Sequence, residues 1–391
     1  MLNSEVIQTN CIGCGLCASV NENIIFEINS EGYYRPIFPS DYNYKELEIF
    51  CPIVYGKNES IDKIWGNYIE VNKSYANDEI VNKKASSGGV ISSILIWLLE
   101  KGKVDGVIQI GSSDTNPLKN KVFLSTSKEE VLKCAGSRYS PASPLISIKE
   151  LLDKDRKYVF VGKPCDCRAL RKYLNSYENF MAEIVLYISF FCAGTPSEKA
   201  TVDLIHKMGA DERKVRNISY RGNGWPGYAT VVDSNGSYQM DYEESWGKIL
   251  GRNKQQFCRI CPDGTGESAD ISCGDAWNLT DNKKPDFSEA NGRNVVFLRT
   301  EKGVRIFDDC LKDGVVSKEQ FPIESLRYIQ PYQYERKATL ISQVVALRIF
   351  RKYTPNLSTK NLIKLSKNVP IKRVLSIFKG TVQRIKKGII Q

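Results

Sequence analysis

Three cysteines spaced three residues apart constrain this chain of 391 residues more than any other feature. Gly13 and Gly15 lie between them, and a Cys-Pro pair follows at 51–52. The cysteines concerned are Cys11, Cys14, Cys17 and Cys51. A C-x2-C-x2-C run with a distant C-P pair is the ligand pattern of a 4Fe–4S ferredoxin. Residues 1–60 are therefore predicted to form a small α+β ferredoxin-like module, whose glycines let the backbone approach the cluster sulfurs.

The module is predicted to hold one cluster rather than two. In two-cluster ferredoxins a further cysteine follows the third one after three residues, and here that position is Asn21. Cys51 is then the fourth ligand. The alternatives are a zinc knuckle or plainly buried thiols, although zinc sites rarely place three thiols at this spacing.

Cysteine usage and the apolar segments indicate where the chain works. Twelve cysteines in a chain that begins without a secretory leader argue for metal or redox chemistry in a reducing compartment, so a cytoplasmic location is expected. The longest mostly apolar run, residues 90–99, is too short to span a bilayer.

Charge is distributed unevenly along the chain. Residues 336–391 contain 14 Lys and Arg and no Asp or Glu, whereas the remaining residues carry 41 basic and 45 acidic side chains, a net charge of −4. Apolar residues at helical spacing predict a helical basic tail over 336–391. Such a tail is expected to meet an acidic partner subunit or an anionic membrane surface, with a solvated extension as the alternative. Nucleic acid is not expected as a partner, because no binding fold accompanies the charge.

Apolar runs and helical patterns alternate between residues 61 and 215. Helical segments at 90–99 and 197–208 flank predicted strands at 106–110, 158–161 and 184–191. Ser87 is expected to cap the first of these helices. The alternation predicts an α/β fold with a mixed, largely parallel sheet, divided into residues 61–150 and 151–335.

A second set of cysteines occurs in the sheet region. Cys258 and Cys261 form a C-x2-C pair, and Cys165 and Cys192 each follow a predicted strand, at the sheet edge where α/β proteins bind ligands. These four are predicted to hold a second 4Fe–4S cluster, with Cys273 as the substitute for either upstream residue. A zinc ribbon or buried thiols are the alternatives. The cysteines read as non-ligands are Cys134, Cys167 and Cys310.

Seven segments in order resemble the family of coenzyme F420 hydrogenase/dehydrogenase beta subunits, which are iron–sulfur flavoproteins. They are Ala85–Gly89, Gly136–Tyr139, Gly162–Cys165, Phe190–Cys192, Arg221–Trp225, Cys258–Cys261 and Ala269–Asp275. The resemblance implies FAD beside a 4Fe–4S cluster, and electron exchange with a deazaflavin such as coenzyme F420 or with another acceptor. The ferredoxin-like module is similar to that of members in bacterial polysaccharide gene clusters, where the deazaflavin is often not expected.

The flavin is expected to bind at the start of the helix over 90–99. Backbone N–H groups and hydroxyls of Ser86, Ser87, Gly88 and Gly89 make a phosphate cradle there, with a simple helix cap as the alternative. Further predicted cofactor-binding residues are Ser137, Arg138, Tyr139 and Lys163. The run 222–227 matches G-x-G-x-x-G, but Pro226 interrupts it and a strand follows, so it does not predict nicotinamide binding.

The single histidine, His206, lies in an ordinary amphipathic helical segment, which argues against His-based zinc sites and Ser-His-Asp catalysis. The leading hypothesis is an oxidoreductase that takes electrons from a one-electron donor such as ferredoxin and delivers them through two clusters and FAD to an organic acceptor, in polysaccharide biosynthesis. The competing hypotheses are a non-catalytic electron-transfer subunit of a larger complex and a structural zinc-binding interaction protein.

Overall fold

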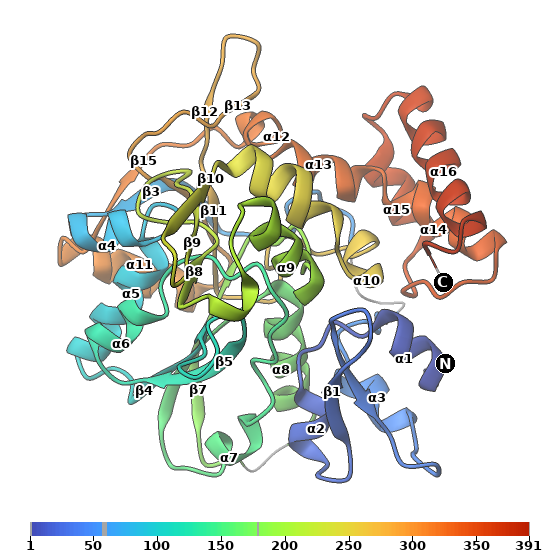
Figure 1. The fold of residues 1–391 in the computed structure, drawn as a ribbon, viewed down its shortest axis with the longest axis horizontal. Helices are drawn as coiled ribbons and strands as arrows, with labels where there is room; N and C mark the ends of the chain where they lie inside the picture. Colours follow the sequence, from blue (N-terminus) through green and yellow to red (C-terminus); the bar gives the residue numbers. More distant parts are fainter. Residues whose placement is uncertain (1, 57–60, 178–179, 391) are drawn as a thin grey trace.

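The central element of the fold is a mixed sheet of eight strands (Figure 1). The structure is a computed structural model that describes residues 2–56, 61–177 and 180–390. In spatial order the strands are β15 (Val316–Glu319), β3 (Glu70–Ala76), β14 (Asn294–Leu298), β11 (Ile271–Asp275), β7 (Glu183–Phe190), β6 (Lys157–Gly162), β4 (Gly106–Ser112) and β5 (Asn120–Ser125).

Four central strands run parallel, and antiparallel strands continue the sheet on both sides. β11, β7, β6 and β4 are the parallel ones, whereas β14, β3 and β15 extend one edge and β5 the other with antiparallel pairing. The predicted mixed α/β class is confirmed. The carboxyl ends of β6, β7 and β11 therefore meet at one edge of the sheet.

The sheet is buried on both faces because its strands alternate between two apolar cores. Ile108, Tyr158 and Phe160 point into one core, which also contains α8, α14 and the N-terminal module. Val107 and Val159 point into the other, against α5, α6 and α11. The helices around the body are α4 (Glu79–Lys84), α5 (Val90–Glu100), α6 (Lys128–Lys133), α7 (Ile148–Leu152), α8 (Pro164–Ser176), α9 (Glu198–Lys207), α10 (Gln256–Arg259), α11 (Glu301–Lys312) and α12 (Leu326–Ile329).

Smaller elements lie beside the main sheet. β8 (Asn217–Ser219), β9 (Ala229–Val232) and β10 (Ser237–Met240) form an antiparallel sheet that shares an apolar cluster with α9. β12 (Asn278–Leu279) and β13 (Pro285–Asp286) form a hairpin. The remaining helical turns are η1 (Glu212–Lys214), the π-helical η2 (Glu243–Ile249), η3 (Leu250–Arg252) and η4 (Ile323–Ser325).

The N-terminal module is built from short helices around one hairpin. Its elements are α1 (Ser4–Asn10), α2 (Leu16–Val20), β1 (Ile25–Ile28), β2 (Tyr34–Ile37) and α3 (Lys45–Phe50). Cys11 and Cys51 are the C-cap residues of α1 and α3. Gly13 and Gly15 have φ values of +76° and +86°, a backbone conformation that glycine adopts without strain.

The C-terminal helices pack on the body and on the N-terminal module (Figure 1). They are α13 (Pro331–Ala338), α14 (Leu340–Ile349), α15 (Thr359–Ser366) and α16 (Ile371–Lys386). The boundary expected at residue 335 falls inside α13, where Arg336 and Lys337 are buried. Lys337 forms an ion pair with Glu267 of the body. Tyr353 donates a hydrogen bond of 3.0 Å to the carbonyl of Ile53 in the module.

The ends of α5 and α9 can be compared with the sequence predictions. The N-cap of α5 is Gly89 rather than the expected Ser87, because the Ser87 hydroxyl instead donates to the Arg293 carbonyl at 3.2 Å. His206 lies in the last turn of α9 and faces Glu212, as expected of a surface residue. Within the described ranges, no helix combines the length and the apolar character needed to cross a bilayer.

Candidate functional site

Four cysteines of the N-terminal module line one small cavity. The first cysteine set consists of Cys11, Cys14, Cys17 and Cys51, and all four border this cavity together with apolar side chains such as Phe26 and Leu47. Burial raises the pKa of each of these thiols, that of Cys51 to about 12. The set therefore fits a group that supplies positive charge to hold thiolates in an apolar enclosure, as the iron of a 4Fe–4S cluster does.

Backbone N–H groups point at the sulfurs of this set. The N–H of Gly13 donates to Cys11 Sγ over 3.3 Å. Backbone N–H groups two residues further on also favour the thiolates of Cys14 and Cys51, so the pattern repeats along the chain. Hydrogen bonds of this kind stabilise charge on sulfur and are one of the means by which a protein tunes an iron–sulfur cluster.

The second cysteine set, Cys165, Cys192, Cys258 and Cys261, comes together at the carboxyl edge of the parallel strands. Cys165 lies in the first turn of α8 directly after β6, Cys192 follows β7, and the other two lie in and just after α10. Burial and Asp166 raise the pKa of Cys165 well above its ordinary value, and Cys192 and Cys261 add to the shift. Burial also raises the pKa of Cys192 and of Cys261, and Cys258 adds to both shifts.

Cys273 stands apart from this group. It lies within β11 and contributes to the core on the far side of the sheet, and burial alone raises its pKa. Cys310 is buried in the same core, and Cys134 is buried beside Gly111 of β4, so both lie away from the two sets. No three His, Cys, Asp or Glu side chains of the described residues form a group that could hold a single metal ion. The ligand atoms of a single metal ion lie closer together than the four sulfurs around a 4Fe–4S cluster, where each cysteine binds a different iron.

Helix α8 lies between the two cysteine sets. Cys165 is in its first turn, and Arg168 one turn later donates a hydrogen bond of 2.8 Å to the carbonyl of Val54, close to Cys51. Burial raises the pKa of Cys14, and the Asp166 carboxylate of α8 contributes after Cys17 and Cys11. One helix therefore connects a loop of each set.

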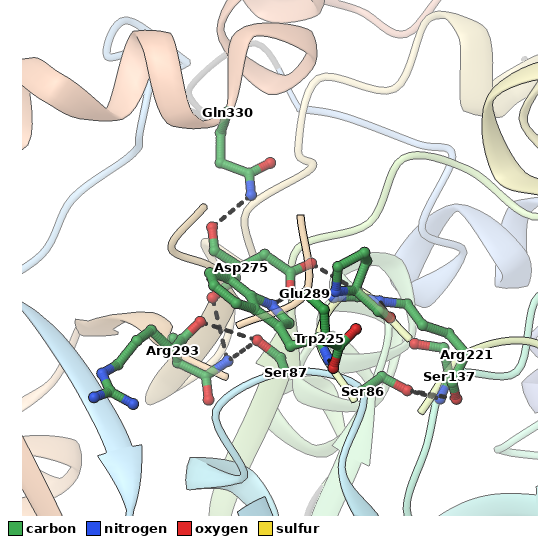
Figure 2. Close-up of polar contacts among 12 residues, drawn as sticks. Ser86, Ser87, Ser137, Arg221, Trp225, Asp275, Glu289, Arg293 and Gln330 are labelled. Atoms are coloured by element: carbon green, nitrogen blue, oxygen red, sulfur yellow. Dashed lines mark hydrogen bonds and ion pairs between the residues drawn. The ribbon is translucent and has the colours of Figure 1, made fainter. Parts of the chain in front are cut away.

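A buried ion pair joins two of the segments that carry the family resemblance (Figure 2). Both nitrogens of the Arg221 fork contact the Asp275 carboxylate at 2.8 Å, and Arg221 Nε donates to the Pro226 carbonyl. Burial opposes the charge of Arg221, but Asp275, with contributions from Tyr139 and Tyr242, outweighs this effect, so the pKa of Arg221 is raised. Trp225 Nε1 also donates to Asp275, at 2.9 Å, and Gln330 donates to its carbonyl at 2.7 Å.

The serines before α5 join the same network. Ser86 donates to the Arg221 carbonyl at 3.1 Å and accepts the backbone N–H of Ser137 at 2.6 Å (Figure 2). Ser87 accepts a hydrogen bond of 2.8 Å from Asn294. Four segments that are far apart in the sequence therefore converge beside the N-terminus of α5.

A cavity of about 600 Å³ opens beside this network. Gly292 and Trp225 contribute to its wall, and the Ser87 carbonyl packs directly against Gly292. Side chains of both charges and several amides line it, among them Glu79, Asn82, Lys83, Glu289 and Arg293. Its size is that of sites for small molecules and cofactors.

The other predicted cofactor-binding residues lie at different places. Arg138 donates to Asn120 and to the carbonyls of Pro117, Lys119 and Ile218, so it ties the strand pair β4–β5 to β8. Tyr139 packs against Trp246 in a tilted arrangement with ring centroids 4.6 Å apart. Lys163 pairs with Asp166 at 2.8 Å and acts electrostatically on Cys165, so it lies beside the second cysteine set.

Several residues of the site were not singled out from the sequence. Asp275, Glu289, Arg293 and Gln330 carry its polar contacts, yet only Asp275 lay in a segment used for the family resemblance. The available signal was the concentration of Asn, Gly and Arg at 291–294, which packs against Ser87.

Comparisons with known proteins point to one family. Its two models describe the N-terminal and C-terminal parts of the coenzyme F420 hydrogenase/dehydrogenase beta subunit, and they match residues 72–150 and 155–323. The coenzyme F420 hydrogenase subunit beta of Methanococcus voltae is 30% identical over 263 residues, which cover 64% of this chain and 84% of that protein. The F420-dependent formate dehydrogenase 1 subunit beta of Methanococcus maripaludis is 28% identical over 248 residues, 62% of this chain and 59% of that protein.

A solved structure extends the likeness to the fold. A chain of the F420-reducing NiFe hydrogenase complex from Methanosarcina barkeri superposes with a TM-score of 0.57 at 24% identity, covering 75% of this chain and 98% of that chain. At this identity the superposition supports the fold alone.

The Arg221–Asp275 pair should matter for stability. We expect Asp275→Asn to lower the free energy of unfolding by about 3 kcal/mol, because it leaves a buried guanidinium without its counter-charge. Asp309→Asn, which removes an exposed pair to Lys103, is the control and should cost less than about 1 kcal/mol. Urea denaturation measures both, and equal losses would contradict this role for the pair.

Proposed function

The chain belongs to the family of coenzyme F420 hydrogenase/dehydrogenase beta subunits, and we propose that this member is an iron–sulfur flavoprotein oxidoreductase. It would take electrons from a one-electron donor such as ferredoxin and deliver them to an organic acceptor. Two 4Fe–4S clusters would supply one-electron chemistry, and FAD would supply the conversion to two-electron chemistry. The observation that carries this proposal is the convergence of eight buried or half-buried cysteines in two sets that α8 connects. Since all twelve cysteines are free, a reducing compartment such as the cytoplasm suits the chain.

The two cysteine sets would hold the clusters in different ways. The first set offers three thiols from residues 11–17 and a fourth, Cys51, from the end of α3, with backbone N–H groups directed at the sulfurs and an apolar lining that excludes water. The second set offers thiols from three separate segments, with Lys163 as a buried positive charge beside Cys165 and Cys192. Cys273 is not needed as a substitute in this arrangement, since it lies on the far side of the sheet.

FAD is proposed to bind in the cavity beside the N-terminus of α5. In the described residues, no hydrogen bond leaves the backbone N–H of Gly88 or Gly89, and α5 directs the positive end of its dipole to the same place. Arg293 lines the cavity and can bind a phosphate. The amide-rich wall also suits a hydroxyl-rich acceptor, and a role in polysaccharide biosynthesis is part of this proposal.

The electron donor is proposed to dock on the C-terminal helices. Ile371 and Leu375 of α16 are 69% and 51% exposed, and Lys372 and Lys379 on the same helix are exposed as well. Apolar side chains bordered by lysines suit an acidic protein partner, and an anionic membrane surface would use the same charges.

A second candidate function is that of an electron-transfer subunit without chemistry of its own. It is favoured by the relatives named as subunits of a hydrogenase and a formate dehydrogenase. The two functions differ in one measurement, because only the enzyme turns over an acceptor when the purified chain is given a chemical one-electron donor.

Iron content tests the two cysteine sets. We expect about eight iron per chain in protein purified without oxygen, four for each cluster, and about four in Cys14→Ser. Cys310→Ser, a change at a buried cysteine of α11, is the control and should keep eight. Iron and sulfide analysis measures the result. About four iron in the unaltered chain, or zinc in place of iron, would rule out the second cluster.

Flavin affinity tests the cavity. We expect Arg293→Gln to raise the dissociation constant for FAD about tenfold, because a charge-assisted hydrogen bond contributes about 1.5–3 kcal/mol. Lys318→Gln on the edge strand β15 is the control, since it removes an exposed positive charge outside the cavity. Fluorescence titration of the flavin-free protein measures both. If Arg293→Gln binds FAD as tightly as the control, the flavin does not use this cavity.

Electron entry tests the docking surface. We expect Lys372→Glu with Lys379→Glu to slow reduction by an acidic ferredoxin several-fold at low salt and to weaken the salt dependence, because the positive field on α16 is reversed. The control is Lys207→Glu with Lys312→Glu, two exposed lysines on other helices. Stopped-flow absorbance measures the rates. Equal rates, together with loss of binding to anionic vesicles, would assign α16 to a membrane instead.

A further inference from the structure

We propose that Arg336 raises the reduction potential of the cluster held by the second cysteine set. The inference rests on the proposed function, because it requires that cluster. Arg336 was grouped with the basic tail on the basis of sequence, yet it is only 8% exposed and lies in α13 between the body and the remaining C-terminal helices.

The chain makes room for the Arg336 guanidinium beside the cysteines. Arg336 Nη2 donates to Gln333 Oε1 at 2.8 Å. At Gly264, a Cβ atom would overlap the guanidinium, so a side chain at this position would displace Arg336 from its place. The carbonyl of Gly264 accepts the backbone N–H of Cys192 at 2.9 Å. The guanidinium therefore packs against the segment that follows Cys261 and accepts the backbone hydrogen bond of Cys192.

The charge of Arg336 has no carboxylate partner among the described residues. Its Nε is buried and makes no hydrogen bond, whereas the neighbouring Lys337 is paired with Glu267. Burial lowers the pKa of Arg336. Tyr332 and the thiols of Cys261, Cys192 and Cys258 outweigh burial, so the pKa of Arg336 is raised. A buried guanidinium needs an anion, and thiolates around an iron–sulfur cluster supply one at this place.

The sign of the effect follows from the charge. Reduction adds one electron to the cluster, and a positive charge at short range in a medium of low polarity stabilises the reduced state more than the oxidised state. An N–H group directed at sulfur acts in the same sense. Loss of the guanidinium charge should therefore make the cluster harder to reduce.

The experiment is a redox titration of Arg336→Gln, followed by electron paramagnetic resonance of the reduced protein. It is made in the Cys14→Ser background, so that the signal of the second cluster is read alone. We expect the equilibrium constant for reduction to fall at least tenfold, which corresponds to a potential lower by about 59 mV for a one-electron couple. Arg336→Lys keeps the charge and should stay within threefold of the parent protein.

Arg373→Gln is the control for loosening of α13. Arg373 of α16 donates to Glu335, the residue before Arg336, at 2.8 Å, so its removal weakens the same contact between helices without changing the buried charge. Its potential should match that of the parent. An unchanged potential in Arg336→Gln, or an equal fall in Arg373→Gln, would overturn the proposal.

Two further outcomes remain interpretable. If Arg336→Gln loses the second cluster, Arg336→Lys decides: retention of iron with a potential near that of the parent supports the role of the charge, and loss of iron in both variants overturns it in favour of packing alone. Absence of a second cluster from the parent protein itself would instead refute the proposed function.

Discussion

The shared carboxyl edge of the parallel strands is the constraint on which the rest of this structure depends. β6, β7 and β11 run in the same direction, so the segments that follow them meet at one place although they are far apart in sequence. Cys165 and Cys192 follow two of these strands, and Asp275 ends the third. The sheet is buried on both faces and cannot shift its register without exposing apolar side chains, which fixes these ends relative to one another.

The N-terminal module and the C-terminal helices complete the arrangement from opposite ends of the chain. The module contacts α8 near Cys51, and α13 brings Arg336 against the segment around Gly264. The two ends also contact each other through Tyr353 and Ile53. Removing the module would remove the first cysteine set, and removing the C-terminal helices would uncover the segment beside the second set, so both ends are integral to the fold around the cysteines.

Local chemistry explains which parts of the fold could be predicted from the sequence. The strand that begins at Gly106 and the helix that begins at Val90 were confirmed, because their signals are carried by neighbouring residues. The family membership was confirmed for a similar reason, since its motifs are short and ordered. The Ser87 cap was wrong because a tertiary contact with Arg293 competes for the same hydroxyl. Glu289 and Arg336 were missed because their roles arise only from packing between distant segments.

The buried charges and thiols of the second set are best understood together. Burial raises the pKa of Cys165 and Cys261 although Lys163 and Arg336 oppose the shift, so deprotonating these thiols is costly without a metal to bind them. Burying the positive charge of Arg336 is also costly, since its Nε has no acceptor among the described residues. A cluster with thiolate ligands would offset both costs at once, because iron stabilises the thiolates and the cluster as a whole is the missing anion. Cluster binding and packing of α13 should accordingly be coupled, and residue 336 belongs to the site although its sequence neighbours form a basic tail.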